Sequence, residues 1–380
     1  LSAEQSNTSI LYGNEFFLKL YRRIEEGANP EPEIIRFLSE KTSFPNIPNF
    51  MGSIEYKQSN GQSQIIALTQ QFIQNESDAW TLLQNAAGRY FDNVLAKREE
   101  LDVSMGSNSL LELDFEKAPQ QMFDLTGATV LEQVGLLGQR SAEMHLALAS
   151  DADDPNFAPE PFSKLYQRSL YQSHRSNVLR GLQFLQRQVN KLPEEMRAEA
   201  DQLVEQKSDI LDYLHHIVDG KISAKKTRIH GDYHLGQVLF TGKDFVIIDF
   251  EGEPSKTPSE RRLKYSPFKD VAGMIRSFHY VVHHALFHRA SIRPEDINFL
   301  EPWVEPWYRM VSGTFLQSYL QTIGDAPILP KETSDLELLL HIFLINKGIY
   351  ELSYELNNRP DWLIVPIRGV ALVLQSIQSI

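Results

Sequence analysis

Residues 228–254 form the stretch that decides the fold, and they read RIHGDYHLGQVLFTGKDFVIIDFEGEP. A polar loop from His230 to Gln237 opens into an apolar run at 238–240, and 241–244 has the composition of a tight turn. A second apolar run follows and ends on Asp249, so the stretch predicts a β-hairpin. Both ends of a hairpin lie together, and we therefore expect Asp232, Gln237 and Asp249 to share one pocket mouth.

The acidic and amide residues of this hairpin are those that phosphoryl transfer requires. One carboxylate receives the proton of the attacking hydroxyl, while a second carboxylate and an amide oxygen hold Mg²⁺ against the nucleotide phosphates. The order H-G-D-x-x-x-x-Q and then D-F-E is similar to the kinase pattern H-x-D-x-x-x-x-N and D-F-G. An ordinary hairpin with one Asp at its end is common, but the ordered set His230, Asp232, Gln237 and Asp249 favours the chemical interpretation.

Length and composition limit the class of protein. The 380 residues are 42% hydrophobic and 23% charged, which is typical of a soluble globular chain long enough for two lobes. The formal net charge of −13 argues against a nucleic-acid or membrane partner, and it indicates that a nucleotide would arrive with its metal. No cysteine is present, which excludes disulfides and thiolate sites, and we expect a cytoplasmic location.

The ends of the chain also carry an expectation. No uninterrupted apolar run approaches the ~20 residues needed to cross a bilayer, and no signal peptide is visible. Because the chain begins at Leu1 and not at Met, we expect it to be a piece of a longer protein.

A lysine in the second predicted strand is the next candidate. Residues 8–12 and 15–21 flank Gly13-Asn14, a two-residue hairpin signal, and Lys19 lies in the middle of the second strand. Such a lysine is either a solvated edge residue or the one that contacts the α- and β-phosphates of a nucleotide. The second interpretation requires a glutamate on a nearby helix.

A helix that begins after Asn29 supplies that glutamate. Asn29 is a favourable N-cap, and the prolines that follow it suit a first turn. We predict Glu33 as the partner of Lys19, while Glu31 is interpreted as a first-turn carboxylate facing the helix dipole.

The pattern changes from strand to helix near residue 75. Residues 52–56 and 64–72 form a further strand pair, after which the chain is mostly helical. We therefore expect a small lobe at 1–75 and a larger helical lobe at 76–380, with backbone groups at the changeover available to an adenine edge.

One late helix carries a polar and aromatic face. It contains Lys347, Tyr350, Glu351, Tyr354 and Glu355, which recur at i, i+3, i+4, i+7 and i+8 and so share a face. Aromatic planes beside charged hydrogen-bonding groups suit a sugar, which offers apolar ring faces and hydroxyl edges. A polar surface stripe with tyrosines that pack between helices would have the same pattern.

Together these features resemble the maltokinases, bacterial relatives of the aminoglycoside phosphotransferases. The likeness rests on stretches spread over the chain, namely EQSNTS (4–9), FLKL (17–20), NPEPE (29–33), FIQN (72–75), HGDYHLGQVL (230–239), IDFEGEP (248–254) and the regions 261–274 and 347–364. The resemblance implies an α+β, bilobal protein-kinase-like fold. Its small antiparallel β N-lobe would lack the cap and first strand of the family, and its large C-lobe would be mainly helical.

The resemblance also implies a role for each candidate residue. Asp232 would be the general base, and Gln237 and Asp249 would bind Mg²⁺. Lys19 and Glu33 would position the phosphates of ATP. A hydroxyl-rich turn would replace a Gly-rich loop, formed by Ser6, Asn7, Thr8 and Ser9. The adenine hinge would be Gln71, Phe72 and Ile73. Further contacts to the substrate would come from His230, His234 and Glu251.

The reaction implied by the family is ATP plus maltose giving maltose 1-phosphate, a precursor of α-glucan. Members also occur fused behind a trehalose synthase domain, so such a domain is a possible partner. Two alternatives stay open. One is a different sugar or amino-sugar kinase of the same fold, and the other is a non-catalytic maltose-binding module attached to a trehalose synthase.

Overall fold

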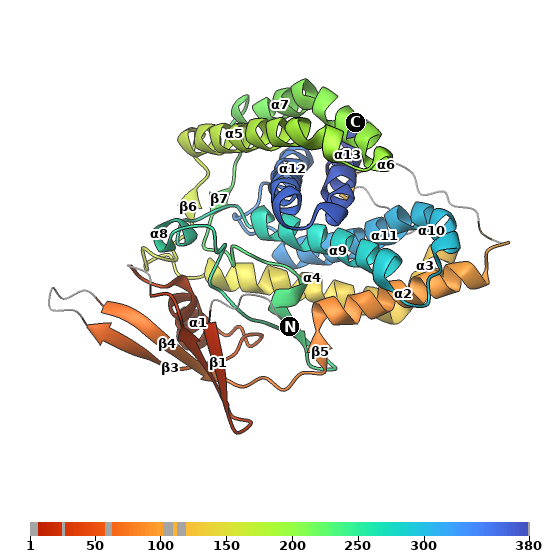
Figure 1. The fold of residues 1–380 in the computed structure, drawn as a ribbon. Coiled ribbons are helices and arrows are strands. Elements are labelled where there is room, and N and C mark those ends of the chain that lie inside the picture. Colours follow the sequence, from red (N-terminus) through yellow and green to blue (C-terminus); the bar gives the residue numbers. More distant parts are fainter. Residues whose placement is uncertain are drawn as a thin grey trace.

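The first part of the chain forms a four-stranded antiparallel sheet in the order β1-β2-β4-β3. The computed structural model describes residues 7–24, 27–57, 63–99, 101, 109–111 and 119–378. The four strands are β1 (Asn7–Tyr12), β2 (Phe16–Tyr21), β3 (Phe50–Lys57) and β4 (Ser63–Gln71). Figure 1 shows this sheet in red and orange at one end of the molecule, with helix α1 (Pro30–Lys41) beside it. The sheet and α1 form the N-lobe.

Local sequence signals explain most of the N-lobe. The Asn29 side chain accepts a hydrogen bond from the backbone N–H of Glu31, and a proline occupies the first turn of α1, as predicted. The turn between β1 and β2 differs from its prediction. Tyr12 pairs with Phe16, so three residues and not two connect the strands.

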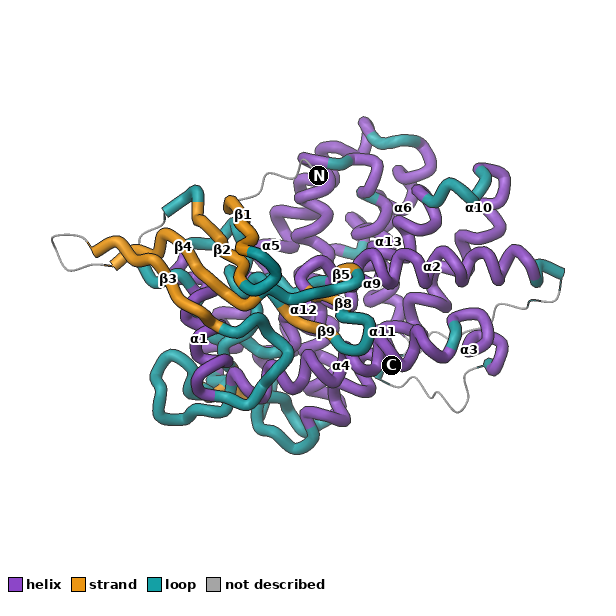
Figure 2. The backbone as a smooth tube through the Cα atoms, turned by 90° about the horizontal axis from the view of Figure 1, so that it is seen from below, coloured by secondary structure: helices purple, strands orange, loops and turns teal. Residues whose placement is uncertain are grey.

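Most of the rest of the chain is helical and forms the C-lobe. The first group consists of α2 (Ala79–Ala96), α3 (Gln120–Thr126), α4 (Ala128–Leu148), α5 (Lys164–Gln188), α6 (Glu194–Glu205) and α7 (Lys207–His215). The second consists of α8 (Pro258–Arg261), α9 (Phe268–His288), α10 (Pro294–Leu300), α11 (Val304–Ile323), α12 (Thr333–Asn358) and α13 (Ile364–Gln378). Helix α9 is buried over most of its length and packs against α2, α11 and α12. Figure 1 shows α5 and α7 lying across α12, and Figure 2 shows the four strands of the N-lobe sheet at one end of the helical body.

The predicted hairpin lies between the two lobes. Strands β8 (Val238–Phe240) and β9 (Phe245–Ile247) pair antiparallel around the expected four-residue turn, and the short strand β5 (Ser77–Asp78) adds to β8. Arg140 of α4 donates to both carboxylate oxygens of Asp244 in the turn, at 2.9 and 2.8 Å. From the N-lobe, Asn46 donates to the carbonyl of Phe245 at 2.8 Å. The hairpin is thus fixed from both sides.

The C-terminal segment Pro360–Gln378 contains a stretch that is long and apolar enough to cross a membrane by length and composition alone. The sequence analysis did not anticipate this. More than half of that stretch, 56%, is buried inside the fold, where α13 packs on α12, α6 and α9. A core helix passes the same test, and the packing explains the composition.

Candidate active site

Lys19 lies in the interior of the N-lobe sheet, directed toward the C-lobe. It pairs across the sheet with Ser9 on β1 and Leu68 on β4, and only 8% of its surface is exposed. Its ammonium nitrogen lies 3.0 Å from a carboxylate oxygen of Glu31. It also forms ion pairs with Asp249 and Glu251, which follow β9. Lys19 therefore joins α1 to the end of the hairpin and is not a solvated edge residue.

The predicted ion pair between Lys19 and Glu33 is wrong. Glu33 faces the C-lobe, where it accepts from Arg228 at 2.9 Å and from Arg262 at 2.9 and 2.6 Å. Two positions along a helix correspond to a rotation of about 200°, so Glu31 and Glu33 cannot face the same way. Glu31 is directed toward Lys19 and also accepts from the hydroxyl of Tyr21 at 2.7 Å.

Burial and crowding shift the pKa values of this cluster. Burial raises the pKa of Glu31 to about 7, and the nearby charges of Asp249 and Glu251 add to that rise against the opposing effect of Lys19. Burial alone would lower the pKa of Lys19, but three carboxylates outweigh it and hold the pKa above its ordinary value. Lys19 therefore stays cationic at the meeting point of the lobes.

Asp249 has a backbone conformation that few non-glycine residues adopt, with φ of 66°. Left-handed conformations at such residues carry strain and are frequent at functional sites. The Gln237 side chain donates to the Asp249 carboxylate, and the backbone N–H of Ile248 donates to the carbonyl of Gln237 at 3.0 Å. Burial would raise the pKa of Asp249, but the charge of Lys19 and the hydrogen bond from the Gln237 side chain lower it. The Asp249 carboxylate is therefore ionised. The hairpin thus brings Gln237 and Asp249 together, as its topology predicts.

The loop that carries Asp232 is held from below by Asp270 of α9. Asp270 is buried and accepts from the backbone N–H groups of His230 and Gly231 at 2.7 and 2.9 Å. A ring nitrogen of His145 from α4 lies 3.2 Å from the same carboxylate. Sequence reasoning missed Asp270 and His145 as site residues, because their role depends on how α4 and α9 pack beneath the loop.

Two glycines set the distance between this loop and the segment after β9. Gly231 and Gly252 both have positive φ, of 90° and 74°. A Cβ atom added to Gly231 would lie 3.2 Å from the Cα of Gly252, which is too close for an ordinary contact. Only glycine permits this approach, and Asp232 therefore lies beside the segment that holds Asp249 and Glu251.

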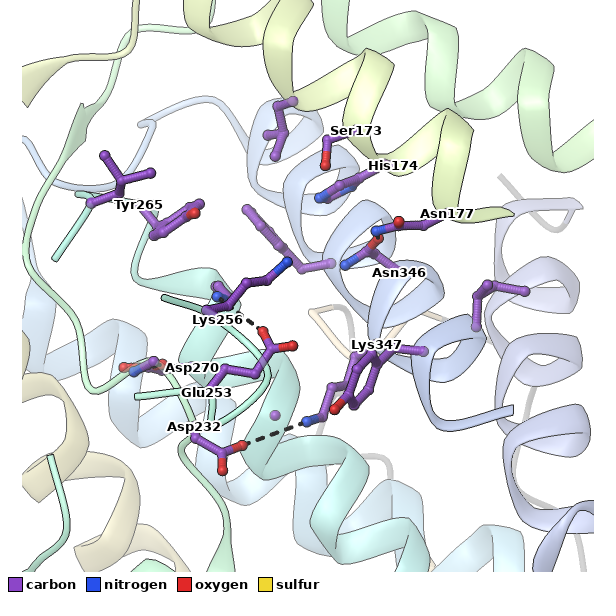
Figure 3. A pocket seen from close by; sticks show the side chains of 18 of the residues that line it. Ser173, His174, Asn177, Asp232, Glu253, Lys256, Tyr265, Asp270, Asn346 and Lys347 are labelled. Carbon is purple, nitrogen blue, oxygen red and sulfur yellow. Dashed lines mark hydrogen bonds and ion pairs between the residues drawn. The ribbon is translucent and has the colours of Figure 1, made fainter. Parts of the chain in front are cut away.

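A cavity of about 530 Å³ opens next to Asp232, and we call it the acceptor pocket. Figure 3 shows Asp232 and Glu253 on one side, Lys347 and Asn346 of α12 on another, and Ser173, His174 and Asn177 of α5 opposite. The ammonium of Lys347 lies 3.9 Å from Asp232, and that of Lys269 lies 4.0 Å from Glu253. Burial lowers the pKa of His174 to about 3, with a further contribution from Lys269, so its imidazole is neutral. The α5 residues, Glu253 and Lys269 were not predicted.

Only part of the predicted α12 face lines this pocket. Lys347 and Tyr350 do so, whereas Glu351 lies 2.8 Å from Arg276 of α9 and Glu355 accepts from Tyr280 at 3.0 Å. Tyr354 is 46% exposed and lies under the Arg359 guanidinium. The prediction of one continuous sugar-facing stripe is therefore wrong, because α9 packs against part of that face of α12.

Three further predicted substrate contacts have other partners in the structure. His230 is buried and donates to the carbonyl of Ile248 at 2.9 Å. His234 caps the short 3₁₀ turn Leu235–Gln237 by accepting from the N–H of Gly236 at 3.1 Å. Glu251 pairs with Lys19 and accepts from Asn7. None of the three is among the described residues that line the acceptor pocket.

The residues expected to form a phosphate-binding turn lie mostly within a strand. Asn7, Thr8 and Ser9 lie within β1, because the pairing with β2 extends to Asn7, while Ser6 lies outside the described residues. At the changeover between lobes, the N–H groups of Gln71 and Phe72 donate to the carbonyls of Asn49 and Glu15, at 3.0 and 2.8 Å. Those two N–H groups are thus committed within the N-lobe, which leaves Ile73 and backbone carbonyls as candidates for adenine.

The donor set beside Lys19 is suited to a hard divalent cation. Carboxylate oxygens of Glu31, Asp249 and Glu251 all lie within 4.8 Å of one another, and the Gln237 side chain adjoins Asp249. Carboxylate and amide oxygens are the ligands that Mg²⁺ takes in nucleotide sites. The residues present therefore fit this ion, with Asp249 and Gln237 as the ligands expected from the sequence.

A small antiparallel sheet with one helix, a large helical lobe and an acidic hairpin between them define the bilobal α+β fold of kinases. Within that class, residues 118–252 match the sequence profile of the phosphotransferase enzyme family. The chain is thus similar to that family over the segment that holds Asp232, Gln237, Asp249 and Glu251.

Sequence relatives include two glucosamine kinases. The protein from Mycolicibacterium smegmatis is 22% identical over 382 residues, which cover 98% of this chain and 79% of the relative. The protein from Streptacidiphilus jiangxiensis is 26% identical over 140 residues, which cover 36% of this chain and 29% of that relative. The chain is therefore similar, at low identity, to these two glucosamine kinases.

Solved structures support the same fold. A glucosamine kinase in complex with glucosamine, ADP and inorganic phosphate has a TM-score of 0.72 at 20% identity, covering 98% of this chain and 81% of that chain. A second crystal form of glucosamine kinase has a TM-score of 0.70 at 21% identity, with coverages of 97% and 77%.

Proposed function

We propose that the chain is a sugar kinase that uses ATP and Mg²⁺. One observation carries this proposal: Lys19 of the N-lobe pairs with Asp249 at the end of the hairpin, and the loop of Asp232 lies beside the same segment. Phosphoryl transfer requires this combination of a phosphate-binding cation, a metal-binding carboxylate and a second carboxylate next to an acceptor cavity. The relatives are kinases, which supports the proposal.

The chain's own residues have distinct tasks in this reaction. Asp232 accepts the proton of the acceptor hydroxyl as the new oxygen–phosphorus bond forms and the bond from the γ-phosphorus to ADP breaks. Lys19, oriented by Glu31, neutralises phosphate charge, and Asp270 holds the loop so that Asp232 stays in register. Mg²⁺, held by Asp249 and Gln237, would neutralise charge on the phosphates.

We propose maltose, phosphorylated at its anomeric hydroxyl, as the acceptor. A volume of about 530 Å³ falls within the range of small-molecule sites, and the pocket combines the Tyr350 ring with amides and hydroxyls on α5 and α12. An amino sugar is the second candidate, since the relatives named above are glucosamine kinases. A maltose-binding module without catalysis would keep this pocket but would not need the cluster around Lys19.

Replacing Asp232 tests the proposal. We expect Asp232→Asn to keep the fold, since the backbone contacts to Asp270 remain, and to lower the rate of sugar phosphate formation by about 10² to 10⁴-fold. The measurement is product formation from ATP and a panel of sugars, with thermal unfolding as the check of folding. A wild-type chain that binds maltose but not nucleotide would instead indicate a binding module.

A further inference from the structure

We propose that the acceptor pocket selects uncharged sugars over amino sugars, and that Glu253 and Lys269 are the specificity-determining pair. The inference rests on the sugar-kinase function proposed above and concerns the charge of the acceptor. It follows from the arrangement of charged groups around the pocket, which includes residues that the reaction itself does not require.

Two carboxylates among the described lining residues have an oxygen open to a ligand, and each faces a lysine. The other oxygen of Glu253 accepts from the hydroxyl of Ser255 at 2.6 Å. Asp232 lies 3.9 Å from Lys347, and Glu253 lies 4.0 Å from Lys269. The third lining carboxylate, Asp270, is occupied by the backbone N–H groups of the catalytic loop. An incoming ammonium group would therefore find both open carboxylates balanced by a neighbouring cation.

The lining carries more positive than negative charge. Lys226 and Lys264 are bound to Glu160 at 2.7 and 3.0 Å, so they matter least. Lys256 and Arg180 also line the pocket, and they add to the charges of Lys269 and Lys347. A cationic ligand that enters the pocket therefore meets like charges at close range. Such repulsion weakens the binding of a charged amino sugar more than it changes the affinity for an uncharged sugar.

The distances within the two pairs suit a hydroxyl group. At 3.9 and 4.0 Å the nitrogen and oxygen atoms are too far apart for a direct hydrogen bond. A hydroxyl is donor and acceptor at once, so it can accept from the ammonium and donate to the carboxylate of the same pair. An ammonium group has only donors and can satisfy only the carboxylate. A neutral polyol therefore satisfies both members of each pair.

Glucose and glucosamine form a matched pair of probes, because they differ by one hydroxyl replaced with an amine. At about pH 6 that amine is protonated, since amino groups of this kind titrate at about pH 8. We expect the wild-type chain to prefer glucose over glucosamine by about tenfold or more in kcat/KM. The Lys269→Met variant should reduce that preference about tenfold, because it leaves Glu253 without its cation.

Two further variants keep the test decisive if Lys269→Met is unstable. Lys256 is exposed, so Lys256→Met should fold normally and shift the ratio in the same direction by a smaller factor. Lys331→Met is the matched control, because Lys331 is 72% exposed and its partner is Asp325, far from the pocket lining. The control should leave the ratio unchanged.

The preference is also measured in binding, as the ratio of the dissociation constants of glucosamine and glucose. NMR titrations without nucleotide give both constants. A chain that phosphorylates neither of these sugars nor maltose, but binds glucose more tightly than glucosamine, would support the charge selection while the sugar-kinase function is revised. A chain that phosphorylates glucosamine as well as or better than glucose would overturn the selection and leave the kinase function standing. Unchanged ratios in both pocket variants would overturn the roles of the lysines.

Discussion

Glu31 is a fully buried carboxyl group of the N-lobe with a strongly raised pKa. Burial raises its pKa from 4.5 to about 7. Between those values the unfolded chain has released this proton while the folded chain still holds it, so the folded state binds more protons and stability falls as pH rises. Glu31→Gln replaces this ionisable carboxyl group with a neutral amide. We expect the variant to lose less stability than the wild type between about pH 5 and about pH 8.

Thermal unfolding of both chains at the two pH values measures this effect. Glu40→Gln is a suitable control, because Glu40 lies on the same helix, is 47% exposed and pairs with Arg36 one turn away. A Glu31→Gln chain that lost as much stability as the wild type would show that Glu31 is already ionised in the folded protein.

The choice between Glu31 and Glu33 shows where sequence reasoning ends at the scale of single residues. Both glutamates lie in the first turn of α1, and nothing local distinguishes the one that faces Lys19. The orientation of the helix on the sheet decides, and that depends on the packing of Ile34, Ile35 and Leu38. The hairpin residues could be predicted together, because the geometry of a hairpin alone joins its two ends.

At the scale of elements, Glu33 links helix α1 to the start of the catalytic loop. Arg228 lies two residues before His230, where that loop begins. It is 1% exposed, and its guanidinium lies 5.3 Å from the Phe157 ring, which stacks on Phe37 of α1. We expect Glu33→Gln to lower the free energy of unfolding by about 2–3 kcal/mol, because the buried Arg228 loses its carboxylate.

Denaturant unfolding measures that loss, and steady-state kinetics measure its effect on the loop. Because α1 also carries Glu31, we expect kcat to fall together with stability, whereas Glu40→Gln should change neither. A Glu33→Gln chain with normal stability would contradict a structural link between the lobes at this position.

The wall of the acceptor pocket was not predictable from local patterns. Asn177 of α5 and Asn346 of α12 are 169 residues apart and form a hydrogen bond of 3.1 Å. The spacing of apolar residues along the sequence predicts both helices. How each helix is rotated toward the other depends on the packing of the whole C-lobe. Glu253 and Lys269 could not be predicted as pocket residues for the same reason, because their place in the lining also depends on the packing of the C-lobe.

At the scale of the whole molecule, nucleotide binding has to overcome the negative charge of the chain. The formal net charge is −13, and three carboxylates surround Lys19. We expect ATP with Mg²⁺ to raise the melting temperature more than ATP with a chelator, because the metal cancels part of this repulsion. In Asp249→Asn the difference between the two conditions should shrink, and thermal shift measurements compare all four samples. Equal shifts with and without the metal would contradict the assignment of Asp249.

The close contact between Gly231 and Gly252 limits which positions of the protein can change in evolution. A side chain at Gly231 would force the loop of Asp232 away from Gly252, and a side chain at Gly252 would lie 3.3 Å from the side chain of Arg261. Both positions also have a positive φ, which other residues adopt only with strain. Saturation libraries at these two sites should therefore return almost only glycine among active clones. The α5 and α12 walls lie outside this constraint, so new acceptor preferences can evolve there while the chemistry stays in place.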